Sequence, residues 1–268
     1  RFLGIDQANI LYSDWPGGSA AYYYGGRFHL WLGDKFGHET VRALHQFNAA
    51  MPIPYFYWPG AMWIYGSSLP QLWEQWRQEL VAQGRLLEER LKKEGMTKSR
   101  RLTHHGRNIA GAQYSPDGKY ILYSRSSPVD GATVRRVNRD GSDDRFLVLQ
   151  TFSPRFSFEK DGGAFYFSQS AVNERFNSYN DLYRYEIASK KSTRLRDVDE
   201  PKRSLRARSP DVSSDGKRLV FVQNRLHQNW VSIGDFVEDE EEPGKPAARI
   251  KVRTLIAPYG DMQHASPR

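Results

Sequence analysis

The stretch Tyr114-Ser-Pro-Asp-Gly-Lys-Tyr-Ile-Leu-Tyr123 occurs three times in this chain in related forms. Its relatives are Phe156-Ser-Phe-Glu-Lys-Asp-Gly-Gly-Ala-Phe-Tyr-Phe167 and Val212-Ser-Ser-Asp-Gly-Lys-Arg-Leu-Val-Phe-Val222. In each copy an Asp-Gly pair lies between strand-forming residues, and Asp-Gly readily adopts the positive φ that a tight hairpin turn requires. Each copy therefore predicts a β-hairpin.

The spacing of the copies predicts units of four strands. The Asp-Gly pairs begin at Asp117, Asp161 and Asp215, which lie 44 and 54 residues apart, enough for four short strands and their turns. The rest of each period supplies further strand patterns, such as Thr133-Val-Arg-Arg-Val137 and Trp230-Val-Ser-Ile233. We expect three four-stranded antiparallel sheets, arranged radially, between about residues 106 and 262.

These repeats resemble the TolB-type, WD-like propeller repeat, in which Ser-Pro-Asp-Gly-Lys precedes an apolar strand. The resemblance covers roughly the last three-fifths of the chain. It implies a β-propeller but no particular function, because propellers include hydrolases, pore-associated proteins and docking platforms.

The positions of Ser-Pro pairs suggest an incomplete propeller. Ser153-Pro154 and Ser209-Pro210 open the second and third repeats, and Ser266-Pro267-Arg268 stands about one period later. Three blades leave a strand edge and a sheet face uncovered. Since residue 1 is Arg rather than Met, we expect an internal fragment of a larger protein that ends at the start of a fourth blade.

Composition narrows the class of protein. The 268 residues are 39% hydrophobic and 13% aromatic, which is typical of a globular chain with room for two domains. There is no cysteine to form a disulfide or a thiolate metal site. The net charge of +8 is spread along the sequence, including the run from Lys202 to Arg208, so it predicts solvated surface charge and no nucleic-acid partner. No run approaches the ~18 apolar residues of a transmembrane segment.

Residues 1–98 have a helical pattern instead. Helices are expected over residues 21–36, 39–47 and 61–65, and Ser68-Leu-Pro-Gln71 is a capping box that begins a longer helix ending near Gly95. We expect one helical core, made by Phe28, Trp31, Leu32, Leu44, Trp73 and Trp76. The expected domains are residues 1–98, a linker at 99–106, and propeller blades 1–3 with the start of blade 4 at 107–268.

A second resemblance covers this helical region. The string from Tyr22-Tyr-Tyr-Gly25 to Gly37, followed by Gly66-Ser-Ser-Leu69-Pro-Gln-Leu-Trp73, resembles the helical domain of gluzincin metallopeptidases. The implied fold class is a multidomain α plus β protein. The helical C-terminal part of a gluzincin-like domain would precede an incomplete TolB-like β-propeller of three four-stranded antiparallel blades.

The gluzincin resemblance also implies a zinc site that this chain does not itself contain. The family's His-Glu-x-x-His motif would lie upstream of residue 1, and His38 and His45 are seven residues apart, too far along a helix to share one zinc. The family's oxyanion-stabilising tyrosine corresponds to Tyr22, or to Tyr23 in the alternative register. The other interpretation of these tyrosines is aromatic packing at the start of a helix.

Two functions follow from these resemblances. In the first, the chain is part of an exported zinc-dependent metallopeptidase of the periplasm or cell envelope, inactive as a fragment, whose propeller docks a peptide or protein substrate. In the second, the protein is a non-catalytic propeller scaffold for a protein or glycan partner in the envelope. No Gly-x-Ser-x-Gly elbow, P-loop or dinucleotide motif adds a third possibility.

Overall fold

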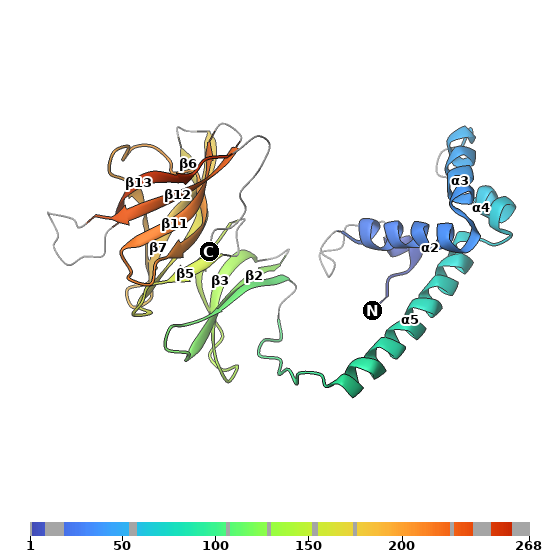
Figure 1. Ribbon diagram of the computed structural model, residues 1–268, viewed down its shortest axis with the longest axis horizontal. Coiled ribbons are helices and arrows are strands. Elements are labelled where there is room, and N and C mark those ends of the chain that lie inside the picture. Colours follow the sequence, from blue (N-terminus) through green and yellow to red (C-terminus); the bar gives the residue numbers. More distant parts are fainter. Residues whose placement is uncertain are drawn as a thin grey trace. The chain divides into compact units, whose positions relative to one another are not determined.

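The computed structural model describes residues 2–8, 19–53, 58–105, 108–127, 130–151, 155–173, 176–225, 228–237 and 248–258. The chain divides into two compact units, Arg1–Arg100 and Arg101–Arg268 (Figure 1). The first unit is helical and the second is built of β-sheets. The acidic run at 238–242, where the sequence indicates an exposed loop, and the predicted start of a fourth blade at 266–268 lie outside the described residues.

The helical unit contains five α-helices and one π-helical turn among its described residues. None of these helices combines the length and the apolar composition that crossing a membrane requires. In chain order the elements are α1 (Ile5–Ala8), the π-helical turn Ala21–Gly25, α2 (Gly26–Phe36), α3 (His38–Ala50), α4 (Trp58–Tyr65) and α5 (Leu69–Glu94).

The ends of α2 and α5 follow directly from the sequence. Helix α2 ends before Gly37, whose φ of 96° is open to glycine but strained for other residues. Helix α5 begins at the predicted capping box. The Ser68 hydroxyl accepts a hydrogen bond from the Gln71 backbone N–H, and the Gln71 side-chain oxygen accepts one from the Ser68 backbone N–H. Gly95 ends α5, also with a φ of 96°.

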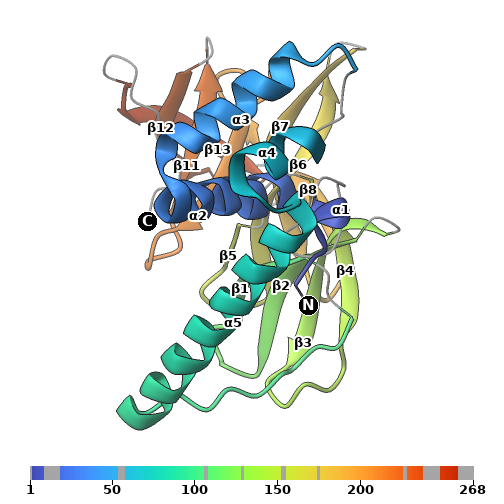
Figure 2. The same cartoon turned by 90° about the vertical axis from the view of Figure 1, so that its right-hand side faces the viewer.

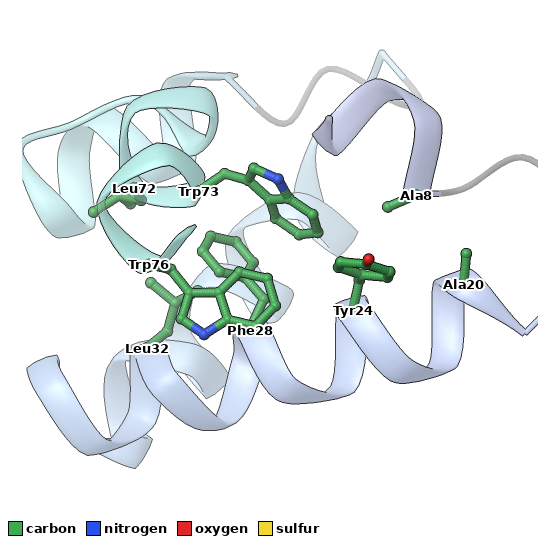
Figure 3. Close-up of a cluster of buried hydrophobic side chains, with 8 residues drawn as sticks. All are labelled: Ala8, Ala20, Tyr24, Phe28, Leu32, Leu72, Trp73 and Trp76. Atoms are coloured by element: carbon green, nitrogen blue, oxygen red, sulfur yellow. The ribbon is translucent and has the colours of Figure 1, made fainter. Parts of the chain in front are cut away.

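An aromatic cluster forms the core of this unit (Figure 3). Trp73 and Trp76 of α5 lie with their ring centres 5.0 Å apart and pack against Phe28 of α2. Trp31 is only half-buried at the edge of this cluster. The placement of Leu44 in this core was wrong: Leu44 is buried but packs at Gly60 of α4. The buried residues of this core are Ala8, Ala20, Tyr24, Phe28, Leu32, Leu72, Trp73 and Trp76.

The described part of the second unit forms three sheets, which we call blades 1, 2 and 3 and whose strands are antiparallel except for one pair in blade 3. Blade 1 has the order β1-β2-β3-β4, blade 2 the order β5-β6-β7-β8, and blade 3 the order β10-β11-β12-β13-β9. The strands are β1 (Asn108–Tyr114), β2 (Tyr120–Ser127), β3 (Gly131–Asn138), β4 (Arg145–Leu149), β5 (Phe156–Phe158), β6 (Ala164–Asn173), β7 (Asn177–Glu186), β8 (Lys191–Arg194), β9 (Arg196–Asp197), β10 (Ala207–Val212), β11 (Arg218–Arg225), β12 (Gln228–Phe236) and β13 (Arg249–Ile256).

The three Asp-Gly pairs form the predicted hairpin turns between the first two strands of each blade. Gly118, Gly162 and Gly216 have φ values of 68°, 74° and 75°. In the first turn the Asp117 carboxylate accepts from the Ser115 hydroxyl at 2.6 Å and from the Lys119 backbone N–H at 3.1 Å. The turn chemistry visible in the sequence therefore sets the register of these hairpins.

The predicted fold class is wrong in its third blade, which has five strands rather than four. The additional strand, β9, pairs with β13 in parallel, and the Arg196 backbone N–H donates to the Ala248 carbonyl at 2.9 Å. A two-residue strand has no sequence periodicity of its own. Its pairing depends on where the chain passes after β8, which the tertiary structure decides.

The predicted fold class is also wrong in its helical part, because no gluzincin-like domain is found. The unit is instead a small aromatic cluster beside a long helix whose C-terminal half lies outside any core. The motifs that suggested the family, Tyr22-Tyr-Tyr-Gly25 and Ser68-Leu-Pro-Gln71, specify a helix start and a cap. Many unrelated helices share such features, so they do not define a domain.

Large apolar side chains join the blades face to face. Tyr120, Leu122 and Val134 of blade 1 meet Phe165 and Phe167 of blade 2 in one buried cluster. A second cluster joins blade 2 to blade 3 through Tyr166, Leu182, Leu195, Leu219, Phe221 and Ile250. This face-to-face succession of antiparallel sheets matches a propeller-type fold.

The face of blade 1 that points away from blade 2 is covered by the segment just before β1. Leu102 packs on Ile121, Tyr123 and Val137. His105, in the same segment, lies 3.1 Å from Asp144 and 3.2 Å from the Tyr123 hydroxyl, so it is anchored to blade 1.

Candidate functional site

The direction of the strands places two kinds of turn on opposite rims of the blades. The Asp-Gly turns lie at one rim. The opposite rim holds the β6–β7 and β11–β12 turns and the connection that enters β10, because alternate turns of an antiparallel meander lie on opposite sides. Two cavities, of about 440 and 480 Å³, have residues of this second rim in their linings.

A buried carboxylate on β7 organises this rim. Asp181 is fully buried and accepts hydrogen bonds from Arg194 of β8, from the Ser204 hydroxyl at 3.0 Å and from the Arg206 backbone N–H at 3.2 Å. Arg194 also donates to the Asn173 side chain at 2.7 Å. Burial raises the pKa of Asp181, and the nearby Arg194 opposes that shift. Asp181 thereby attaches the connection into blade 3 to blade 2.

The attached connection holds Arg206 in an unusual backbone conformation. Its φ is 48°, in the left-handed region that non-glycine residues rarely adopt. The Arg206 carbonyl accepts from the Asn224 backbone N–H at 2.8 Å, and the preceding Leu205 carbonyl accepts from the buried Gln223 side chain at 3.0 Å. Contacts on both sides therefore fix the direction in which the Arg206 side chain leaves the backbone.

The Arg206 side chain stacks on Tyr179 of β7. The guanidinium carbon lies 3.9 Å from the centre of the tyrosine ring, close enough for a cation–π interaction. The Arg206 Nε is buried and has no hydrogen-bond partner within the described part of the chain. Arg206 also lines two cavities, so a ligand can reach its guanidinium there even though the Nε itself is buried.

Arg206 and Asn224 line both cavities. The smaller cavity has no carboxylate among its lining residues, which are Ser170, Ser178, Tyr179, Asn180, Arg206, Arg208 and Asn224. We call this set the Arg206 site. The lining of the larger cavity is of mixed charge, because it includes the acidic residues Asp197, Asp199 and Glu200 and the basic residues Arg203, Arg206 and Arg225. Guanidinium groups bind planar oxyanions through paired N–H donors, so the Arg206 site has the chemistry to bind a carboxylate.

The tyrosines predicted as catalytic lie in the other unit, and both are exposed. Tyr22 is 82% exposed and Tyr23 61% exposed, while Tyr24 enters the aromatic core. No group of three or more His, Asp or Glu side chains positioned to hold a metal ion occurs among the described residues. The oxyanion role of Tyr22 or Tyr23, and the zinc expected upstream, stay predictions.

Sequence reasoning did not identify Asp181 or Arg206 as site residues. The basic run from Lys202 to Arg208 was interpreted as solvated charge, and for the half-buried Arg206 this was wrong. One signal in the sequence was the charged Asp181 within the apolar alternation of Asp181-Leu-Tyr-Arg-Tyr. An ionisable residue at a core position needs a partner, but the sequence does not show which residue provides it.

Sheet order and blade contacts place the second unit in the class of propeller-type β-repeat folds. No protein-family model matches the chain, and no curated protein matches its sequence.

Among solved structures, the chain is similar to "putative TolB from Agrobacterium tumefaciens", at 20% identity and a TM-score of 0.40, covering 50% of this chain and 45% of that one. TolB from Acinetobacter baumannii gives 18% identity and a TM-score of 0.40, covering 55% and 32%. The β-propeller domain of the Trilobed protease from Pyrococcus furiosus gives 14% identity and a TM-score of 0.38, covering 55% and 42%. The chain thus spans less than half the length of each. At these TM-scores the similarities carry no argument about function.

Proposed function

We propose that the propeller-type unit is a binding module that captures an acidic segment of a protein partner at the Arg206 site. One observation carries this proposal: the Arg206 guanidinium, held by stacking on Tyr179, lines both cavities of this rim. A ligand carboxylate would accept from this group. Arginine and tyrosine are also enriched among the residues that dominate the energy of protein interfaces.

The neighbouring cavity favours a peptide over a polyanion. A uniformly acidic glycan that continued from the Arg206 site would meet Asp197, Asp199 and Glu200. A peptide with one carboxylate and further polar or basic groups would not be repelled there. Ser170, Ser178 and Asn180 can exchange hydrogen bonds with a peptide backbone.

A selection experiment tests this function. Octapeptides displayed on phage are selected on the immobilised 268-residue protein, and the affinity of enriched peptides is then measured by fluorescence anisotropy. We expect enrichment of Asp or Glu at one position and at least a tenfold loss of affinity in Arg206→Gly. Arg218→Ala, which removes an exposed arginine at the opposite rim, is the matched control and should bind normally.

Two results would contradict the proposal. One is selection without acidic enrichment, or with the same enrichment on Arg206→Gly as on the natural sequence. The other is tight binding of polygalacturonate without any acidic peptide, which would favour the glycan alternative.

We also keep the prediction that the protein is exported and that the partner belongs to the cell envelope. This prediction rests on the resemblance of the repeats to the TolB type. Fractionation of cells that make the full-length protein tests it, and recovery in the cytoplasmic fraction would contradict it.

A further inference from the structure

The C-terminal half of α5 has no packing partner in its own unit. The buried residues of α5 are Leu72, Trp73 and Trp76, all near its start, while every residue from Leu80 to Glu94 is exposed. Figures 1 and 2 both show this half extending past the other helices of the unit. Isolated helices of about 12–15 residues are marginally stable in water, which favours a partner for this segment.

The exposed half carries an apolar stripe that continues the core face of the helix. With 100° between successive residues, Leu80, Leu87 and Leu91 lie on the same side as Trp73 and Trp76. These three leucines are 36%, 46% and 39% exposed. Leu86 is 68% exposed and lies outside this stripe. The stripe therefore has the spacing of a helix–helix packing seam.

Gly84 lies within this stripe without a local reason to be glycine. Gly84 is in the helix interior, and a Cβ there would meet nothing within 4 Å. Glycine weakens a helix relative to alanine, so its position here is unfavourable for an isolated helix. A residue without a side chain does allow a large side chain of another helix to approach closely.

A cavity of about 490 Å³ lies between α2 and α5 at the start of the stripe. Its apolar lining includes Tyr23, Leu30, Trp76 and Leu80, and Leu30 is 59% exposed. Leu91 of the same helix cannot fill this cavity, because it lies 11 residues beyond Leu80, which is about 16 Å along the helix axis.

We propose that two copies of this chain associate through antiparallel α5 helices, with the two-fold axis between Gly84 and Leu87. In this register Leu80 faces Leu91 of the second copy, and Gly84 faces its Leu87. Leu91 of each copy thereby reaches the cavity beside Leu80 of the other. The interface is isologous, as in most homodimers.

The charges along α5 are compatible with this register. Arg77 faces Glu94 of the second copy, and Gln83 faces its Glu88, so neither pair brings like charges together. The segment 80–94 contains four basic and three acidic residues. This near-neutral balance gives no preference for a strongly charged partner and does not oppose self-association.

Sedimentation equilibrium of the 268-residue protein between about 1 and 100 µM tests the proposal. We expect a reversible dimer whose Kd rises at least tenfold in Leu87→Glu and stays within twofold in Leu86→Glu, the matched control on the neighbouring position. Gly84→Ala should also raise the Kd, although it favours the isolated helix. A monomer throughout this range, or equal effects of Leu87→Glu and Leu86→Glu, would overturn the proposal.

Disulfide trapping tests the register separately, since the chain has no cysteine. The double variant Leu80→Cys with Leu91→Cys should form covalent dimers on mild oxidation. Each single variant should not, because equivalent positions are then about 16 Å apart, beyond disulfide reach. Cross-linking by either single variant, or none by the double variant, would contradict the antiparallel register.

Discussion

The guanidinium carbon of Arg206 lies 3.9 Å from the centre of the Tyr179 ring. Tyr179 belongs to β7 of blade 2, whereas Arg206 ends the connection into β10 of blade 3. The contact therefore exists only when two successive blades are packed together. The same contact orients the one guanidinium on which the proposed peptide binding depends.

Replacement of Tyr179 should weaken peptide binding without unfolding the protein. In Tyr179→Leu the aromatic face is lost, and the cation–π contribution of about 0.5–1 kcal/mol predicts a roughly two- to fivefold rise in Kd. Tyr179→Phe keeps the ring and is the control. Fluorescence anisotropy with a selected acidic peptide measures both, and a larger loss in Tyr179→Phe would assign the role to the hydroxyl group.

Arg206→Gly should leave the stability of the protein nearly unchanged. A left-handed backbone costs about 1–2 kcal/mol for a non-glycine residue, and glycine relieves this strain. The lost stacking on Tyr179 is worth about 0.5–1 kcal/mol. Thermal unfolding should therefore show an unchanged or slightly raised Tm. A large fall in Tm would mean that Arg206 is mainly a structural residue.

Asp181→Asn should destabilise the second unit strongly. The substitution keeps the size of the side chain but leaves Arg194 without its buried counter-charge, which typically costs about 3–5 kcal/mol. The control is Asp143→Asn at an exposed ion pair with Arg145, where we expect at most about 1 kcal/mol. Denaturant unfolding followed by circular dichroism measures the difference, and equal effects would show that the Asp181 pair is not important for stability.

The first Asp-Gly turn should contribute to the loss of folding stability at acidic pH. Hydrogen bonds from the Ser115 hydroxyl and then the Lys119 backbone N–H lower the pKa of Asp117 from 3.8 to about 2. A lowered folded-state pKa gives stability that is complete above the unfolded pKa and is lost as the pH falls through the folded pKa. Between pH 4 and pH 2, Asp117→Asn should therefore lose less stability than the natural sequence. Parallel pH profiles of the two proteins would contradict this assignment.

Trp76→Ala should destabilise the helical unit by about 3–5 kcal/mol. Trp76 is 3% exposed and contacts the rings of Phe2, Tyr24, Phe28 and Trp73. Trp63→Ala, at a side chain that is 78% exposed, is the control and should change stability little. Helical circular dichroism during denaturant unfolding measures both. A Trp76→Ala variant as stable as the control would place Trp76 outside the core.

Local signals in the sequence determined the hairpins and the helix ends. Asp117-Gly118 and its two relatives predicted each turn, because a positive φ and a carboxylate near the following backbone N–H are properties of adjacent residues. Ser68 with Gln71 predicted the start of α5 for the same reason. These features depend on residues within about five positions of one another, so the tertiary structure does not alter them.

The tertiary structure decided the rest, because those features join residues far apart in the chain. The fifth strand β9 forms only where the chain passes the edge of β13, more than 50 residues later. The Arg206 site likewise needs Asp181 and Tyr179 from one blade beside Arg206 and Asn224 from the next. The motifs that resembled a gluzincin domain are local helix signals, and local signals cannot specify how helices pack together.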